Sequence, residues 1–279
     1  MKIAVTGASG FIGRHVLKEL NNKGFEVTAL TRDVIKFEND NLNINIVQMD
    51  ISNPPENAYK IMGSPDTLIH LSWDGLPNFN SCHHFESELP AQYSFLKKII
   101  EAGVSTVLVT GTCFEYGMQS GQLSEDIPLL PNNSYGFAKA TLCRQLEFLK
   151  KITPFKLIWA RLFYMYGEGQ AISSLYPKLE EAVKMGRNEF NLSGGEQLRD
   201  YMAVEDIANI IVKLVKIDQD IGKINICSGH PISVRKLVEK WLSENNWKMN
   251  LNLGYYPYLS YEPMAFWGAR AKLDKFLDT

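Results

Sequence analysis

The sequence predicts an α/β fold, in which a parallel sheet carries helices on both faces and is followed by a smaller C-terminal lobe. Two observations lead to this prediction. Short apolar runs alternate with longer segments of helical periodicity as far as residue 162, which is the pattern of repeated βαβ units. Beyond residue 162 this alternation is lost, and no Gly/Ser-rich linker divides the 279 residues. We therefore expect the second part to pack onto the first.

Each element is predicted from a local pattern. The first helix is the clearest example, because Val16, Leu17 and Leu20 recur on one helical face and Gly24 ends the pattern. Strands are predicted at residues 3–5, 25–31, 44–49, 67–71, 106–110, 155–161 and 224–227. Helices are predicted at residues 11–22, 88–102, 135–151, 173–185, 204–216 and 234–245, with a loop at 164–170 and little periodicity at 251–267.

Composition excludes several classes of function. The chain is 45% hydrophobic and 22% charged with a net charge of -2, so nucleic acid and membrane surfaces are not expected as partners. Its four cysteines are widely spaced, which argues against a zinc ribbon or a disulfide framework and fits a reducing compartment. No apolar run is long enough for a signal peptide or a membrane span. We expect a cytoplasmic protein. No metal site is expected either, because the adjacent His83 and His84 point apart on a helix or strand and no acidic or cysteine cluster converges on them.

A glycine-rich segment connects the first predicted strand to the first predicted helix. Gly7, Gly10 and Gly13 have the spacing G-x-x-G-x-x-G. In this context the first glycine permits a tight turn, the second a close approach to a pyrophosphate, and the third close packing of helix on strand. The alternative is a set of glycines that merely ends a strand. We predict a Rossmann-type dinucleotide site with contacts from Gly7, Ser9, Gly10, Phe11, Ile12 and Gly13.

The end of the second predicted strand bears on the choice between NAD(H) and NADP(H). An NAD site usually carries an acidic residue there, which binds the adenosine ribose. This chain has Thr31 and Arg32, and an arginine can bind a 2'-phosphate. NADP(H) is therefore favoured. NAD(H) stays open, because Asp33 could bind the ribose if Arg32 is only a solvated surface cation. Asp50 and Ile51, after the third strand, are expected to flank the adenine.

Tyr135 and Lys139 are four residues apart in a predicted helix, so their side chains share one face. A nearby ammonium is expected to lower the pKa of a phenol and to let it donate or accept a proton. The spacing Y-x-x-x-K often arises by chance. It gains weight here because it follows a dinucleotide loop in the same chain.

With both motifs present, the chain resembles the extended short-chain dehydrogenase/reductases, the superfamily of nucleotide-sugar epimerases, dehydratases and reductases. The resemblance covers nearly the whole chain and implies a homodimer that pairs through the helices at 88–102 and 135–151. Leu142, Leu146 and Leu149 suggest an apolar face for this pairing, although some of them must pack on the sheet instead. The resemblance is carried by residues 6–13, 70–72, 110–112, 116–117, 135–139, 161–167, 198–206 and 225–229.

The resemblance implies catalytic and cofactor-binding roles for matching positions. Tyr135 is the expected acid/base, Lys139 its partner and a ribose contact, and Thr112 the residue that hydrogen-bonds the substrate oxygen. The remaining expected cofactor contacts are Leu71, Ser72, Trp73 and Leu162.

Substrate contacts are implied in the same way. Arg199 matches an arginine that contacts the nucleotide diphosphate, and a structural salt bridge to Asp200 or Glu205 is the alternative. The other expected substrate contacts are Trp73, Thr112, Cys113, Phe114 and Tyr164.

Departures from the family pattern narrow the reaction. In the superfamily that this chain resembles, the 4,6-dehydratases place an Asp-Glu pair directly after the catalytic Thr. Here Cys113 and Phe114 occupy those positions and Glu115 comes one place late. A simple ketone reductase needs only the Thr, Tyr and Lys set. Cys113 is expected to be a small thiol that faces the substrate, although a role as a base stays open.

The leading interpretation is an NAD(P)H-dependent reductase of the C4 ketone of a nucleotide-diphosphate 4-keto-6-deoxyhexose. A dTDP-sugar is favoured, as in bacterial reductases that make 6-deoxyhexoses for surface polysaccharide. The alternative is a C4 epimerase or dehydrogenase with tightly bound NAD. A non-catalytic dinucleotide-sensing protein is disfavoured, because the expected catalytic residues are intact.

Two lobes are expected from these assignments. Residues 1–162 should form the dinucleotide-binding domain, to which 202–228 return. Residues 163–201 and 229–279 should form the substrate-binding lobe.

Overall fold

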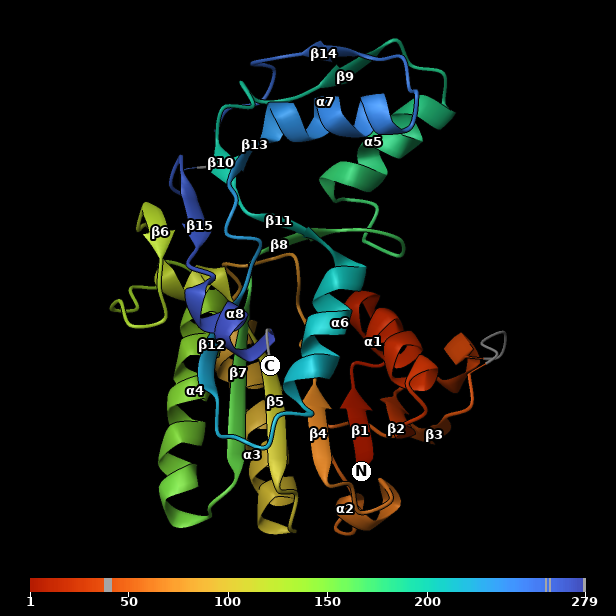
Figure 1. Cartoon of the computed structure of the whole chain (residues 1–279), viewed down its shortest axis with the longest axis vertical. Helices are drawn as coiled ribbons and strands as arrows, with labels where there is room; N and C mark the ends of the chain where they lie inside the picture. Colours follow the sequence, from red (N-terminus) through yellow and green to blue (C-terminus); the bar gives the residue numbers. More distant parts are fainter. Residues whose placement is uncertain (38–41, 259, 261, 278–279) are drawn as a thin grey trace.

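The computed structural model describes residues 1–37, 42–258, 260 and 262–277. In this part of the chain the largest sheet has seven parallel strands in the order β12-β7-β5-β4-β1-β2-β3 (Figure 1). The predicted α/β fold with a Rossmann-type parallel sheet is confirmed. The strands of this sheet are β1 (Lys2–Thr6), β2 (Glu26–Thr31), β3 (Asn45–Gln48), β4 (Thr67–His70), β5 (Thr106–Thr112), β7 (Lys156–Leu162) and β12 (Gly222–Ile226).

Strand burial follows from position in the sheet. Every residue of the central strands β4 and β5 is buried, as expected for a parallel sheet covered on both faces, whereas the edge strand β3 is largely exposed. The chain order reverses between β1 and β4, because β1 leads to β2 on one side and β4 leads to β5 on the other. Such a reversal opens a crevice at the carboxyl ends of the strands, where ligands bind in this class of fold.

Helices cover both faces of the sheet (Figure 1). On one face α1 and α6 share a core in which Val16 and Leu17 pack with Ile207 and Ile211. On the other face α3 and α4 form a second core around Phe95, and this core also contains leucines of α4. The helices that flank the sheet are α1 (Phe11–Asn22), α2 (Ala58–Ile61), α3 (Leu89–Glu101), α4 (Ser134–Ile152), α6 (Val204–Leu214) and α8 (Ala271–Leu277).

A separate group of elements lies beyond the carboxyl ends of the sheet, at the top of Figure 1. It contains α5 and α7 with the strand pair β9 and β14, around a core of its own that includes Leu179, Leu237 and Trp241. Its elements and the short strands that join it to the sheet are β8 (Tyr164–Tyr166), α5 (Leu175–Lys184), β9 (Glu189–Asn191), β10 (Leu198–Arg199), β11 (Tyr201–Ala203), β13 (Ile232–Ser233), α7 (Val234–Glu244) and β14 (Asn250–Asn252). Two further short strands, β6 (Gly121–Leu123) and β15 (Phe266–Gly268), pair beside the sheet.

One local prediction was wrong, and several short elements form where none was predicted. Residues 164–170, expected as a loop, begin with strand β8, because this segment pairs with β11 rather than continuing the central sheet. Residues 251–267, which show no periodicity, contribute to β14 and β15, since these strands are too short to show an alternating pattern. Helix α8 is also missing from the predictions. In each case the element depends on a partner that is distant in sequence.

The leucines of α4 pack inside the chain and are not exposed for contact with a second copy. Leu142, Leu146 and Leu149 are all buried in the core of this chain. The apolar side chains that α4 leaves exposed include Phe148 and Ile152.

Within the described residues, no helix combines the length and the apolar character that are needed to cross a bilayer.

Candidate active site

The glycine turn after β1 is shaped by close backbone contacts. Gly7 has φ +66°, and its carbonyl accepts a hydrogen bond from the Gly10 amide at 2.9 Å. A Cβ on Gly13 would lie 2.2 Å from the Gly7 carbonyl oxygen, so only glycine lets α1 sit directly on the turn. The first turn of α1 has no acidic residue, and its N-cap Gly10 offers no side chain. The amides at this helix start are therefore free for an anion such as the pyrophosphate of a dinucleotide.

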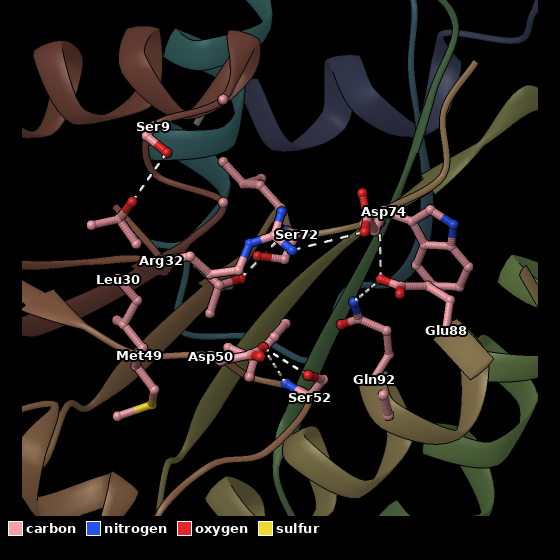
Figure 2. Close-up of a pocket in the computed structure, with 18 of the residues that line it drawn as sticks. Ser9, Leu30, Arg32, Met49, Asp50, Ser52, Ser72, Asp74, Glu88 and Gln92 are labelled. Atoms are coloured by element: carbon pink, nitrogen blue, oxygen red, sulfur yellow. Dashed lines mark hydrogen bonds and ion pairs between the residues drawn. The ribbon is translucent and has the colours of Figure 1, made fainter. Parts of the chain in front are cut away.

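A cavity of about 500 Å³ opens at the carboxyl ends of β1, β2 and β4 (Figure 2). It brings together most of the predicted cofactor residues. Those that line it are Gly7, Ser9, Gly10, Thr31, Arg32, Asp50, Ile51, Leu71, Ser72 and Trp73. Those that do not line it are Phe11, Ile12, Gly13, Tyr135, Lys139 and Leu162. Lys36, Glu88 and Gln92 also line it, although no local motif marks them in the sequence.

Two basic residues, Arg32 and Lys36, line the cavity near the end of β2. Arg32 reaches across the cavity and ends 3.8 Å from Asp74, as Figure 2 shows. Thr31 contributes a hydroxyl rather than a carboxylate. This hydroxyl lies 3.2 Å from the Ser9 hydroxyl. The carboxylate of Asp33 accepts a hydrogen bond from the Ile35 amide at 3.1 Å, at the start of a short 3-10 helix (Val34–Phe37). Asp33 does not line the cavity.

The predicted catalytic residues lie together at the junction of β5 and α4. Thr112 ends β5, and Tyr135 and Lys139 lie in the first two turns of α4; all three are buried. The ammonium of Lys139 donates a hydrogen bond to the Thr110 carbonyl at 2.8 Å and sits 4.0 Å from the ring centroid of Trp73. Only 1% of Lys139 is exposed, so a low-dielectric environment surrounds its charge.

The expected direction of the Tyr135 pKa shift is wrong for this structure. Burial raises the pKa of the Tyr135 phenol, and the charge of Glu115 raises it further, while a hydrogen bond with Thr112 opposes the shift. Burial also lowers the pKa of Lys139 to about 7, which the carboxylates of Glu115 and Glu88 partly oppose. Tyr135 is therefore fully protonated at neutral pH. In this state it is a proton donor rather than a base.

Glu115 holds the catalytic segment in place. Its carboxylate is completely buried and accepts hydrogen bonds from the Thr112 amide at 2.9 Å, the Trp159 indole at 2.9 Å and the Arg161 guanidinium at 2.8 Å. Arg161 in turn donates to the Tyr116 hydroxyl at 3.1 Å. Since both oxygens of Glu115 are engaged inside the protein, this residue cannot replace the missing acid of the dehydratases.

An aromatic wall stands beside Tyr135. The Trp73 indole donates to Nδ1 of His84 at 3.1 Å, and Nε2 of His84 contacts the Asn78 carbonyl at 2.8 Å. A carbonyl only accepts, so Nε2 carries the proton. The ring centroids of His84 and Tyr135 are 5.4 Å apart. Within the described residues, no group of three His, Cys, Asp or Glu side chains could hold a metal ion.

A second cavity, of about 600 Å³, lies under the group that contains α5 and α7. Tyr164 and Arg199 line it, whereas Cys113 and Phe114 do not. Burial and the charge of Glu262 raise the pKa of the Cys113 thiol, which makes it a poor base. Arg199 forms an ion pair with Glu262 at 2.8 Å, and Glu262 also lines the cavity.

The alternative partners expected for Arg199 are engaged elsewhere. Asp200 accepts hydrogen bonds from the Ser228 and Gly229 amides, and Glu205 faces His15.

Comparison with known proteins decides the family. Residues 3–227 match the model of the NAD dependent epimerase/dehydratase family. The chain belongs to this family. It is 32% identical to dTDP-6-deoxy-L-talose 4-dehydrogenase (NAD(+)) from Aggregatibacter actinomycetemcomitans, over 97% of this chain and 100% of that protein. It is 30% identical to GDP-6-deoxy-D-talose 4-dehydrogenase of the same organism, over 86% of this chain and 78% of that one.

The fold is also similar to a solved structure of this class. The UDP-glucuronic acid 4-epimerase from Bacillus cereus, in complex with UDP-glucuronic acid and NAD, aligns with a TM-score of 0.83. The alignment covers 100% of this chain and 93% of that one at 21% identity. The resemblance seen in the sequence is thus confirmed. This chain is an enzyme of the NAD dependent epimerase/dehydratase family with a Rossmann-type nucleotide-binding sheet.

Proposed function

We propose that this enzyme reduces the C4 ketone of a nucleotide-diphosphate 4-keto-6-deoxyhexose, with a dTDP-sugar as the favoured substrate. The observation that supports this proposal most strongly is the buried, protonated phenol of Tyr135 beside Thr112. The neighbouring acids and bases are engaged or neutral: Glu115 is held by Arg161, both ring nitrogens of His84 are hydrogen-bonded, and burial raises the pKa of the Cys113 thiol. A proton donor without a second base suits ketone reduction better than dehydration.

In the proposed reaction each residue of the site has one task. Thr112 hydrogen-bonds the ketone oxygen, and Tyr135 donates the proton to that oxygen as it gains charge. Lys139 stabilises the phenolate that remains and contacts the nicotinamide ribose. The reduced nicotinamide, when bound, supplies the hydride from its C4. Trp73 covers Lys139 and, together with Phe114, excludes water from the reacting centre.

NADP(H) is the favoured cofactor in this proposal, and NAD(H) is the alternative. Arg32 can bind a 2'-phosphate, Lys36 lines the same cavity, and Thr31 places no carboxylate against such a group. Asp33, which could otherwise bind a ribose diol, already accepts a hydrogen bond from Ile35. In favour of NAD(H), the similar talose dehydrogenase is named for NAD(+).

The remaining parts of the proposal concern organisation. Residues 163–201 and 229–279 form the substrate-binding lobe, and 202–228 return to the nucleotide-binding domain. A homodimer forms through α3 and α4, with Phe148 and Ile152 as the exposed apolar residues rather than the buried leucines. The enzyme acts in the cytoplasm and supplies sugars for surface polysaccharide.

The decisive experiment is a substrate screen. The purified enzyme is incubated with dTDP- and GDP-4-keto-6-deoxyhexoses and either NADPH or NADH, loss of the reduced-nicotinamide absorbance is followed, and the product is assigned by NMR. Reduction at C4 is the expected result. A C4 epimerase with tightly bound NAD would instead interconvert two nucleotide sugars without net consumption of added cofactor, and that outcome would contradict the proposal.

A further inference from the structure

A buried histidine fixes the aromatic ring that covers the catalytic lysine. The Trp73 indole donates to Nδ1 of His84 at 3.1 Å, and the two rings are stacked with their centroids 6.3 Å apart. The centroid of the Trp73 ring lies 4.0 Å from the Lys139 ammonium, and the ring meets that of Tyr135 edge-on at 5.8 Å. An indole has one donor and no acceptor, so His84 holds the single polar group of this ring.

The loop after β4 is folded around His84. No part of His84 is exposed, and its Nε2 donates to the Asn78 carbonyl at 2.8 Å. Gly75 has φ +86°, and a Cβ there would lie 2.9 Å from the His83 ring and 3.1 Å from the His84 ring. Both ring nitrogens of His84 thus have a partner in the neutral form. An apolar side chain in its place would leave the Trp73 indole and the Asn78 carbonyl unpaired inside the protein.

The same loop reaches the start of the catalytic helix. The Phe79 carbonyl accepts a hydrogen bond from the Tyr135 amide at 3.0 Å, and the Asn80 carbonyl accepts one from the Ser134 hydroxyl at 3.2 Å. His84 begins a π-helix of five residues that leads into α3, and such helices are rare and frequent at functional sites. Its ring centroid is 5.4 Å from that of Tyr135. His84 therefore lies between the loop and the reacting centre.

We propose that His84 is a positioning residue for the reduction, which holds the Trp73 ring across the Lys139 ammonium. This inference rests on the proposed function and adds to it a residue that does not itself line the dinucleotide cavity. A ring held over an ammonium attracts it and fills space that water would otherwise occupy. Without the His84 contact the ring is free to turn, and the ammonium loses its fixed place 5.9 Å from the centre of the Tyr135 ring. A displacement of about 1 Å in such a site can cost about a hundredfold in rate.

His84→Phe and His84→Gln form a matched pair. Phenylalanine keeps a planar ring but offers no acceptor to the Trp73 indole, whereas glutamine has an amide oxygen for Trp73 and an amide N–H for Asn78. With cofactor and 4-keto sugar at saturation, His84→Phe should lower kcat by on the order of ten- to a hundredfold, with little change in KM for the sugar. His84→Gln should restore most of kcat. A purely structural role would lower the melting temperature without separating kcat from KM.

Trp73→Phe tests whether His84 acts through the indole. This variant removes the donor of the same hydrogen bond and should also lower kcat. Combining it with His84→Phe should cost no more than the larger of the two single losses, because both changes break one contact, whereas independent roles would multiply the losses. Ser134→Ala is the control, because it removes another side-chain hydrogen bond to the same loop and should leave kcat unchanged.

A spectroscopic measurement reports on the contact itself. The chain has five tryptophans, and the indole resonance of Trp73 is the one that disappears from the proton–nitrogen correlation spectrum of Trp73→Phe. A hydrogen bond to an imidazole nitrogen moves an indole proton downfield. The Trp73 resonance should therefore shift upfield in His84→Phe and stay near its wild-type position in His84→Gln. The other tryptophan resonances show whether each variant is folded.

The outcomes separate this inference from the proposed function. Full kcat in folded His84→Phe, equal losses in folded His84→Phe and His84→Gln, multiplied losses in the double variant, or a comparable loss in Ser134→Ala would overturn the positioning role and leave the proposed function intact. If His84→Phe does not fold, unchanged kcat in Trp73→Phe overturns it instead. Absence of turnover by the wild type with every 4-keto sugar offered would overturn the proposed function and this inference with it.

Discussion

Replacing Tyr135 with phenylalanine should separate catalysis from binding. The ring lies among four aromatic neighbours, with centroid distances of 5.8 Å to Trp73, 5.8 Å to Phe79, 5.4 Å to His84 and 6.4 Å to Phe114. Phenylalanine keeps these contacts and removes only the hydroxyl. Tyr135 does not line the dinucleotide cavity, so cofactor affinity should change little.

The size of the loss follows from the role of the proton donor. General acid catalysis by a positioned side chain typically contributes about 10²–10⁴-fold, which corresponds to about 3–5 kcal/mol of the activation barrier. The free energy of unfolding should change by no more than about 1 kcal/mol, because two effects oppose each other. The variant loses one buried hydrogen bond, with Thr112, but it also no longer has to bury a polar hydroxyl. Steady-state reduction of the 4-keto sugar gives kcat/KM, and cofactor fluorescence gives the dissociation constant.

Tyr116→Phe is the matched control. The Tyr116 hydroxyl donates to Asn225 at 2.7 Å and accepts from Arg161 at 3.1 Å, at a buried position outside the reacting centre. Its removal takes one buried hydrogen bond from each of Asn225 and Arg161 and should cost about 1–3 kcal/mol of stability, with little change in kcat/KM. The reasoning is refuted if Tyr135→Phe retains near-full activity, or if it loses stability in the way that Tyr116→Phe does.

Three further outcomes are expected. Arg32→Ala should weaken the binding of NADPH by roughly ten- to a hundredfold and the binding of NADH much less. Titration of both reduced cofactors measures the two affinities, and equal losses would show that Arg32 does not bind a 2'-phosphate. Gly13→Ala should abolish binding of either cofactor in calorimetry, because the added Cβ would lie 2.2 Å from the Gly7 carbonyl oxygen; unchanged affinity would contradict the tight-turn argument. Lys139→Met should abolish reduction yet raise the melting temperature, most of all below about pH 7. Folding lowers the pKa of this amine from 10.5 to about 7, so protonation of Lys139 favours the unfolded chain. The gain should shrink as pH rises toward 10.5, and a lower melting temperature below pH 7 would count against it.

The elements that could be predicted are those whose sequence signals lie within the element or directly beside it. Helix α1 begins and ends at the predicted residues, because its apolar face and the glycines at both ends are local signals. Strands β14 and β15 could not be predicted in this way, since each is three residues long and depends on a partner strand far along the chain.

The same division applies to the candidate site. The predicted motifs place Thr112, Tyr135 and Lys139 together, because a strand end and one helix face carry them. Glu115 and Glu262 carry no motif, and their roles depend on arginines 46 and 63 residues away. The Tyr135 pKa was predicted in the wrong direction for a related reason. A spacing of four residues shows that a lysine is near, but it does not show how completely both groups are buried.

Burial of the catalytic pair bears directly on the direction of the proposed reaction. A ketone that accepts hydride needs a neutral acid beside its oxygen, and the raised pKa keeps Tyr135 in that form at neutral pH. Oxidation of an alcohol needs the phenolate, which a nearby positive charge stabilises. Lys139 supplies only part of that charge, because its own pKa lies at about 7. Burial of the pair therefore favours reduction, in which Tyr135 gives its proton to the ketone oxygen.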